Sequence, residues 1–120
     1  MKILVIDDEP EFRLMLTEWL TRQGHEAEHV PDGPEIFDVL QQRQFDVILL
    51  DLVMPKTNGL TLISEVRRLY PQTTVIIISA AVNIRIAVEA AKAGAEACLT
   101  KPVDFAALRY ELTRLARPEN

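Results

Sequence analysis

Three short segments of the chain are apolar at every position: residues 3–6, 47–50 and 75–78. They consist of Ile, Leu and Val only, and polar residues flank each of them. Such segments are typical of strands covered on both faces of a parallel sheet. Residues 26–30 and 97–100 mix polar and apolar positions, as edge strands do. The pattern therefore predicts three central strands and two edge strands.

Segments with helical periodicity lie between and after the predicted strands. In the first of these helices, Pro10 marks the first turn and Gly24 follows the last residue, Arg22. Its apolar positions recur every three or four residues: Phe12, Met15, Leu16, Trp19 and Leu20. Comparable helices are expected at residues 34–42, 60–69, 83–93 and 104–116.

Strands and helices thus alternate five times, which predicts an α/β fold of the (βα)5 type. Right-handed crossovers and the two mixed edge strands fit a doubly wound parallel sheet, flavodoxin-like, with strand order 2-1-3-4-5. We place one domain at residues 1–117 and expect 118–120 to be its C-terminal end or the start of a linker. Ligands of such folds bind beyond the carboxyl ends of the strands, where the winding reverses.

The charge and composition of the chain exclude several classes of function. Its 120 residues carry 13 Lys and Arg against 18 Asp and Glu, a net charge of −5, and the basic residues are scattered. We therefore expect no nucleic-acid binding by this chain. The single cysteine, Cys98, excludes an internal disulfide. Without an apolar segment of membrane-spanning length or a signal peptide, a cytoplasmic location is expected.

Polar residues follow four of the five predicted strands. Clustered carboxylates repel one another, so they are held most easily by a hard cation such as Mg²⁺, which also takes phosphate oxygens as ligands. An ammonium and a hydroxyl nearby supply donors for an anion. The pattern predicts a Mg²⁺ site that holds a phosphoryl group. Its members are Asp7, Asp8 and Glu9 after the first strand, Asp51 after the third, Ser79 after the fourth and Lys101 after the fifth.

Each residue also has a purely structural interpretation. Asp8 can cap the first helix, and Glu9 can favour its positive end. Asp51 and Ser79 can simply begin a loop and a helix, and Lys101 can be a solvated surface charge. The joint arrangement at four strand ends favours phosphoryl chemistry over these separate interpretations.

Six short segments carry a more specific signal. They are Ile6-Asp7-Asp8-Glu9, Asp51-Leu52-Val53-Met54-Pro55, Asn58-Gly59-Leu60, Ser79-Ala80, Ala93-Gly94-Ala95 and Leu99-Thr100-Lys101-Pro102. With them the chain resembles, from Lys2 to about Leu115, the receiver domain of two-component response regulators. The resemblance implies that Asp51 is the phosphoacceptor, that Lys101 and Ser79 contact the phosphoryl oxygens, and that the Lys101-Pro102 bond is cis. The implied Mg²⁺ ligands are Asp8, Asp51, the backbone carbonyl of Val53 and, through a bound water, Asp7.

The resemblance also implies how the phosphoryl group arrives. Its source is a phosphohistidine on a sensor histidine kinase or phosphotransfer protein, so His25 and His29 need no catalytic role. The domain then catalyses only its own phosphorylation and dephosphorylation. The alternative is an aspartyl-phosphate phosphohydrolase of the haloacid dehalogenase type, which needs an acid two residues after its nucleophile, as Glu9 follows Asp7. A dinucleotide enzyme is disfavoured because residues 7–11 lack glycine.

Three positions depart from the family pattern. Cys98 stands where the family usually has a Tyr or Phe that turns inward on activation, which puts a ring-based switch in doubt. Val53 and Ala81 are apolar where relatives often have polar groups, and we expect a longer phosphoryl lifetime. The switch is instead expected to run from Ser79 through the loop that contains Ala80 and Ala81.

The last two helices suggest a surface for partners. The pattern predicts that Ile84, Ala87, Val88 and Ala91 face inward on the fourth helix and that Ala93 faces outward. It likewise predicts an exposed surface consisting of Ile86, Ala90 and Tyr110, and the resemblance implies that this surface binds a second copy of the chain or an effector.

Overall fold

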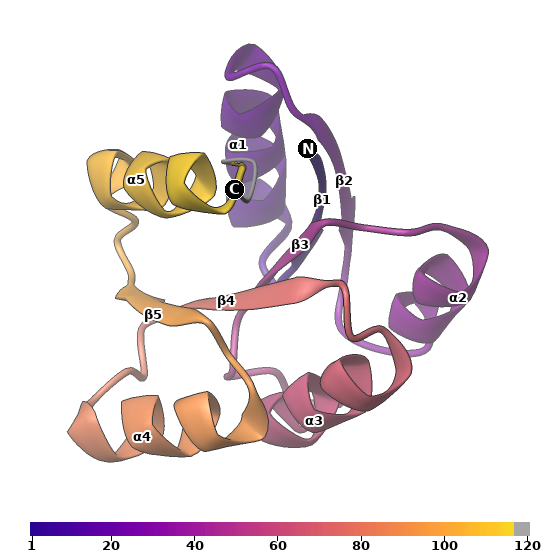
Figure 1. Cartoon of the computed structure of the whole chain (residues 1–120), viewed down its shortest axis with the longest axis vertical. Coiled ribbons are helices and arrows are strands. Elements are labelled where there is room, and N and C mark those ends of the chain that lie inside the picture. Colours follow the sequence, from indigo (N-terminus) through magenta and orange to yellow (C-terminus); the bar gives the residue numbers. More distant parts are fainter. Residues whose placement is uncertain (117–120) are drawn as a thin grey trace, which may run out of the picture.

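The computed structural model describes residues 1–116 and contains the predicted alternation of strands and helices (Figure 1). The strands are β1 (Lys2–Ile6), β2 (Glu26–Val30), β3 (Val47–Leu50), β4 (Thr74–Ser79) and β5 (Ala97–Thr100). The helices are α1 (Pro10–Arg22), α2 (Glu35–Gln42), α3 (Gly59–Leu69), α4 (Ile84–Ala93) and α5 (Phe105–Ala116). Each predicted element agrees with these bounds within one residue. The expected chain end at 118–120 lies outside the described residues.

The five strands form one parallel sheet in the order β2-β1-β3-β4-β5, which confirms the doubly wound prediction. β1 and β3 are neighbours, with Ile6 opposite Leu50. The backbone amide of Asp51 donates to the Ile6 carbonyl at 3.1 Å, so the pairing continues to the end of both strands. Because of this register, the residues that follow β1 and β3 leave the sheet side by side.

Helices cover both faces of the sheet: α1 and α5 lie on one side, and α2, α3 and α4 on the other (Figure 1). Alternate residues of β1 supply the two cores. Leu4 and Ile6 pack with α2, α3 and α4, whereas Ile3 and Val5 pack with α1 and α5. Each such buried side chain stabilises the fold by about 1.5–3 kcal/mol. Two buried faces explain why the central strands are apolar at every position.

Asparagine side chains begin two of the helices that follow the site. Asn58 Oδ1 accepts from the Thr61 amide at 3.1 Å, and Asn83 Oδ1 accepts from the Ile86 amide at 2.8 Å. These bonds satisfy amides that lack a partner within the helix. They fix where α3 and α4 start relative to the loops after β3 and β4. Among the described residues, no helix is both long and apolar enough to cross a membrane.

The predicted orientation of α4 is wrong. Ala90 is fully buried and Ile86 is half-buried, whereas Ile84 is 86% exposed and Val88 is 48% exposed. Ala93, predicted to face outward, also packs against the α2-α3-α4 side of the core. Ala90 is therefore not part of the proposed partner surface. Tyr110 on α5 is exposed, as predicted.

The physical reason lies in the charge pattern of α4. Arg85, Glu89 and Lys92 mark a single line along the helix, and the residues on both flanks of that line are apolar. Periodicity alone therefore allows two inward faces. The alanine-rich flank is the one that packs, because small side chains let α4 approach α3 and the sheet closely.

Candidate functional site

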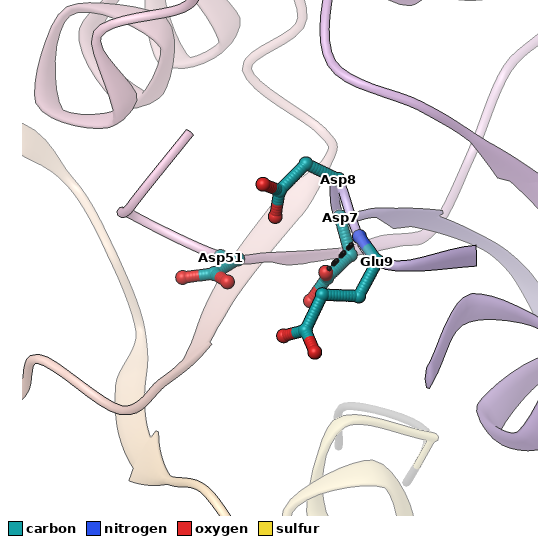
Figure 2. A group of neighbouring side chains, drawn as sticks. All are labelled: Asp7, Asp8, Glu9 and Asp51. Carbon is teal, nitrogen blue, oxygen red and sulfur yellow. Dashed lines mark hydrogen bonds between the residues drawn. The ribbon is translucent and has the colours of Figure 1, made fainter. Parts of the chain in front are cut away.

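The loops after β1 and β3 bring four carboxylates together at the carboxyl edge of the sheet (Figure 2). One oxygen from each of Asp7, Asp8, Glu9 and Asp51 lies within 4.8 Å of the others. Asp7 and Asp51 are 1% and 5% exposed, whereas Asp8 and Glu9 face the solvent. We call these four residues the acid cluster. The structure thus brings together the acidic residues that the sequence predicts at this edge of the sheet, Glu9 included.

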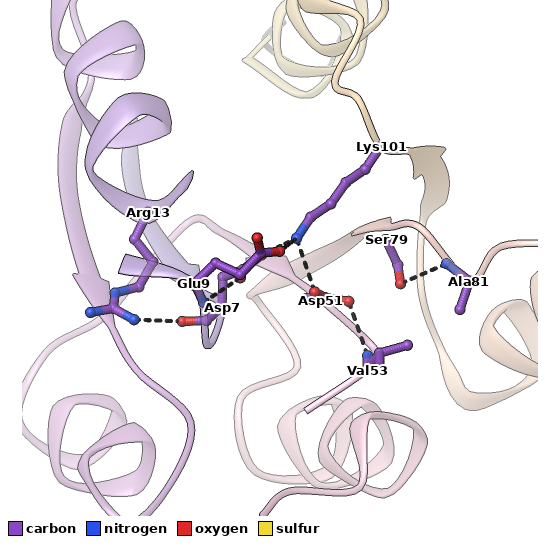
Figure 3. Close-up of polar contacts among 8 residues, drawn as sticks. All are labelled: Asp7, Glu9, Arg13, Asp51, Val53, Ser79, Ala81 and Lys101. Carbon is purple, nitrogen blue, oxygen red and sulfur yellow. Dashed lines mark hydrogen bonds and ion pairs between the residues drawn. The ribbon is translucent and has the colours of Figure 1, made fainter. Parts of the chain in front are cut away.

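Lys101 follows β5 and reaches into the acid cluster (Figure 3). Its Nζ lies 2.8 Å from Asp7 Oδ2, 2.9 Å from Glu9 Oε1 and 3.0 Å from Asp51 Oδ2. The Lys101-Pro102 bond is cis, as the resemblance implies. The ammonium also lies 4.2 Å from the centre of the Phe12 ring. The sequence predicts Phe12 as an apolar position of the first helix, and nothing in the pattern indicates this cation–π contact.

Burial and ion pairing oppose each other in this cluster. Burial alone would lower the pKa of Lys101, but its hydrogen bonds to Asp7, Glu9 and Asp51 outweigh burial and raise that pKa above its usual value. The pKa of Asp7 is raised because burial outweighs the bonds that it accepts from Lys101 and the Glu9 amide. Lys101 therefore stays charged, and Asp7 resists losing its proton more than an exposed carboxyl does.

Both oxygens of Asp51 have partners from different directions. Oδ2 contacts Lys101, and Oδ1 accepts from the backbone amide of Val53 at 2.9 Å. Val53 also forms an isolated antiparallel bridge with Asn58, which precedes α3. The carboxylate is thus oriented by its own loop and by the residue after β5.

Ser79 ends β4 and is fully buried, and Asp51 lies between it and Asp7 in Figure 3. Its Oγ accepts from the Ala81 amide at 3.3 Å, a long bond within its own loop. The structure thus brings Asp51, Lys101 and Ser79 to one edge of the sheet, with the Ser79 hydroxyl engaged by Ala81.

Arg13, on the first turns of α1, supports the loop after β1. Its Nη1 donates to the Asp7 carbonyl at 2.8 Å, and its Nε donates to His29 Nδ1 at 3.3 Å. His29 is exposed on β2, and His25 contacts the N-terminal amine at 3.1 Å. Neither histidine is a member of the acid cluster. No sequence signal links Arg13 to Asp7, because a bond to a backbone carbonyl needs no particular residue type there.

The three positions that depart from the family pattern differ in their surroundings. Cys98 is half-buried in β5 against the α2-α3-α4 core, and burial raises the pKa of its thiol. It is therefore a small apolar core residue. Val53 and Ala81 are exposed and line one pocket of about 380 Å³, together with Ile86 of α4. Both positions that we expect to tune phosphoryl lifetime thus face the same opening.

The acid cluster fits a magnesium ion by its chemistry. All its ligand atoms are carboxylate oxygens, the hard donors that Mg²⁺ prefers, and its exposed side leaves room for the waters that Mg²⁺ usually keeps. The helix-cap interpretation of Asp8 is wrong, because the N-cap of α1 is Glu9 and its side chain makes no capping bond. Asp8 therefore stands at the cluster with its carboxylate uncommitted to the helix.

Comparison with known proteins identifies the family. Residues 3–113 match the model of the response regulator receiver domain. The chain is similar to the response regulator protein PilR of Pseudomonas aeruginosa, with 36% identity over 98% of this chain and 27% of that protein. It is 31% identical to the chemotaxis protein CheY of Thermotoga maritima, over 84% of this chain and 85% of that protein.

A solved structure agrees in fold. TrrA from Thermotoga maritima, in complex with Mg²⁺-BeF, superposes with a TM-score of 0.84 at 29% identity, covering 95% of this chain and 97% of that one. The chain spans about a quarter of the length of the first curated relative, PilR (27%). The fold, the acid cluster and these matches together show that the chain belongs to the response regulator receiver domain family.

Proposed function

We propose that Asp51 is the phosphoacceptor of this receiver domain. The carrying observation is the position of Lys101 Nζ, which pairs with Asp51 Oδ2 at 3.0 Å while it also neutralises the buried Asp7. Asp51 lies between the loop after β1 and Ser79 (Figure 3), so groups on both sides can contact an incoming phosphoryl group. The haloacid dehalogenase-type alternative is not supported by the matched family.

The proposed reaction transfers a phosphoryl group from a phosphohistidine on a sensor histidine kinase or phosphotransfer protein. An oxygen of Asp51 attacks phosphorus, the new O–P bond forms, and the N–P bond to the donor imidazole breaks. Lys101 offsets the negative charge that develops on the transferring oxygens. The chain thereby catalyses only its own phosphorylation and dephosphorylation.

Magnesium would be held by Asp8, Asp51 and the Val53 carbonyl, with Asp7 acting through a bound water. When bound, Mg²⁺ supplies the positive charge that lets a phosphoryl group approach the acid cluster. Asp7, buried and tied to Lys101, keeps the ammonium aimed at Asp51.

Ser79 is proposed to pass the signal to α4. A charge-assisted bond to a phosphoryl oxygen is stronger than the 3.3 Å bond that its hydroxyl accepts from Ala81. Because the hydroxyl oxygen can keep accepting from Ala81 while its proton is donated to the phosphoryl group, movement of Ser79 toward that group would pull the loop of Ala80 and Ala81 that leads to α4 along with it. Cys98 has no ring to swing between two positions, so this loop is the proposed switch. The response then reaches the α4-β5-α5 face, where Tyr110 is 67% exposed.

The test uses a small phosphodonor such as acetyl phosphate with Mg²⁺ and intact-protein mass spectrometry. We expect one added phosphoryl mass in the wild type, none in Asp51→Asn and none with a chelator. Asp46→Asn is the matched control, because Asp46 lies at the opposite end of β3, and it should be phosphorylated normally. Phosphorylation of Asp51→Asn, or steady turnover of a generic phosphoester, would contradict the proposal.

A further inference from the structure

The loop between β2 and α2 is bonded to the loop between β3 and α3. Asp32 is 8% exposed, and its Oδ2 accepts from the backbone amide of Lys56 at 2.6 Å. The two residues are 24 positions apart in the chain. A charged acceptor and a short distance mark a strong hydrogen bond. Asp32 is not a member of the acid cluster, so this contact is separate from the metal ligands.

The other oxygen of Asp32 has no partner. Among the described residues, Asp32 Oδ1 is the buried side-chain atom that lacks a hydrogen bond. A buried carboxylate oxygen without a partner destabilises the folded state, so a residue that only filled space would be better apolar here. Asp32 thus has one oxygen that destabilises the fold and another that makes a short hydrogen bond. This combination is typical of a residue that has a function.

Gly33 brings Asp32 into this position. Its φ of 127° belongs to a conformation that residues with a side chain rarely adopt, and its Cα faces the Lys56 side chain, since an added Cβ would lie 3.8 Å from Lys56 Cδ. The Gly33 carbonyl accepts from the Ile36 amide at 3.2 Å, which ties this turn to the start of α2. Asp32 is therefore held against the loop by a turn anchored on a helix.

The contact fixes the middle of the loop that carries Val53. At the start of this loop, the Val53 amide donates to Asp51. Val53 also forms a β-bridge with Asn58, which lies at the end of the loop. Lys56 lies between Val53 and Asn58, and its amide is held by Asp32. We propose that Asp32 is a positioning residue for metal binding, which fixes the β3–α3 loop so that Val53 is held at the acid cluster. This inference rests on the proposed use of the Val53 carbonyl as a magnesium ligand.

The test measures Mg²⁺ binding directly by calorimetry, without a phosphodonor. We expect Asp32→Ala to weaken Mg²⁺ binding about tenfold, the lower end of the range for partners that orient metal ligands. Asp32→Asn keeps an oxygen acceptor for the Lys56 amide and should restore most of the affinity. The matched control is Asp46→Ala, because Asp46 Oδ2 also accepts a distant backbone amide, that of Lys2 at 2.8 Å, but far from the site.

Three results would overturn the proposal: wild-type affinity in Asp32→Ala, an equal loss in Asp46→Ala, or no rescue by Asp32→Asn. At saturating Mg²⁺, the maximal phosphorylation rate of Asp32→Ala should approach that of the wild type, because only the metal requirement changes. Hydrogen exchange can be measured on the wild type, without any substitution. The Lys56 amide should be protected from exchange, and its NMR resonance should shift when Mg²⁺ is added. Exchange as fast as in an exposed loop would contradict the contact. Phosphorylation of Asp51→Asn would refute the phosphoacceptor but leave these binding results unaffected.

Discussion

The two ends of the sheet treat polar groups in opposite ways. At the amino end, each group has its own partner: Asp46 accepts the Lys2 amide at 2.8 Å, and the Thr73 hydroxyl donates to the Phe45 carbonyl at 2.8 Å. At the carboxyl end, three of the four carboxylates of the acid cluster, those of Asp7, Glu9 and Asp51, share the ammonium of Lys101. At the amino end, the hydrogen bonds of the polar groups are balanced, and their role is structural. The carboxyl end has excess negative charge, which can bind a metal ion and, with it, a phosphoryl group.

Among the substitutions that test this contrast, loss of Lys101 should have the largest effect on stability and phosphorylation. Asp7 and Asp51 are buried, so Lys101→Met leaves them unpaired, and we expect a loss of about 3–5 kcal/mol in the free energy of unfolding without Mg²⁺. Phosphorylation should slow by about 100-fold or more. Denaturant unfolding and the rate of mass gain measure the two effects. Lys2→Met is the control, because the ammonium of Lys2 makes an exposed 4.0 Å contact with Glu26 and the substitution keeps the Lys2 amide. A similar loss in Lys2→Met would contradict the contrast.

Val53 and Ala81 sharpen the comparison through the lifetime of the phosphoryl group. Because neither side chain can hydrogen-bond an attacking water, Val53→Asn and Ala81→Glu should each speed dephosphorylation several-fold. The decay of the phosphorylated mass after removal of the donor measures this. Both side chains are exposed at the same pocket, so the free energy of unfolding of the two variants should be close to that of the wild type. Unchanged decay in both variants would show that these positions do not control access of water.

Removing one acidic side chain should change the free energy of unfolding in opposite directions at the two ends of the sheet. Without Mg²⁺, Asp8→Ala relieves repulsion and should raise the free energy of unfolding by about 0.5 kcal/mol. Asp46→Ala loses a hydrogen bond and should lower it by about 0.5–1 kcal/mol. Adding Mg²⁺ should stabilise the wild type and Asp46→Ala more than Asp8→Ala. Denaturant unfolding with and without Mg²⁺ measures these differences, and the same sign for both variants would refute the contrast.

The smallest expected effect is the pH dependence from Asp7. Burial raises its pKa in the folded state, so the folded protein binds this proton more tightly than the unfolded chain does. Its contribution to stability is therefore full below the ordinary value of 3.8 and is lost as the pH rises through the folded pKa. Asp7→Asn should abolish this part of the pH dependence, as measured by unfolding at several pH values without Mg²⁺. A slope that is unchanged in Asp7→Asn would contradict the assignment.

The sequence predicts the sheet and the edge that carries the site because both follow from local patterns. A segment such as 47–50, apolar at every position, fits only a strand covered on both faces, and Asp51 must then leave the sheet beside the residues after β1. In a parallel sheet, all the strand ends with polar residues lie at one edge. This geometry brings Lys101 to Asp51 although 50 positions separate them in the chain.

The parts that the sequence does not predict depend on choices between equivalent local patterns. The apolar flanks of α4 are equivalent until packing buries Ala90. Asp32 and Gly33 form a turn signal, and nothing local to them indicates that Asp32 accepts the Lys56 amide. Glu9 is predicted at the site, but nothing local to it indicates its 2.9 Å contact with Lys101.

The central claim is that the excess charge at the carboxyl end serves one phosphorylated carboxylate, Asp51. An acyl phosphate is reduced by borohydride, which converts the phosphorylated aspartate to homoserine. The wild type, treated with acetyl phosphate and Mg²⁺ and then with borohydride, should show homoserine at position 51 by peptide mass mapping and none at Asp7, Asp8 or Asp46. Homoserine at Asp7 or Asp8, or at no position despite a measured gain of phosphoryl mass, would contradict the claim.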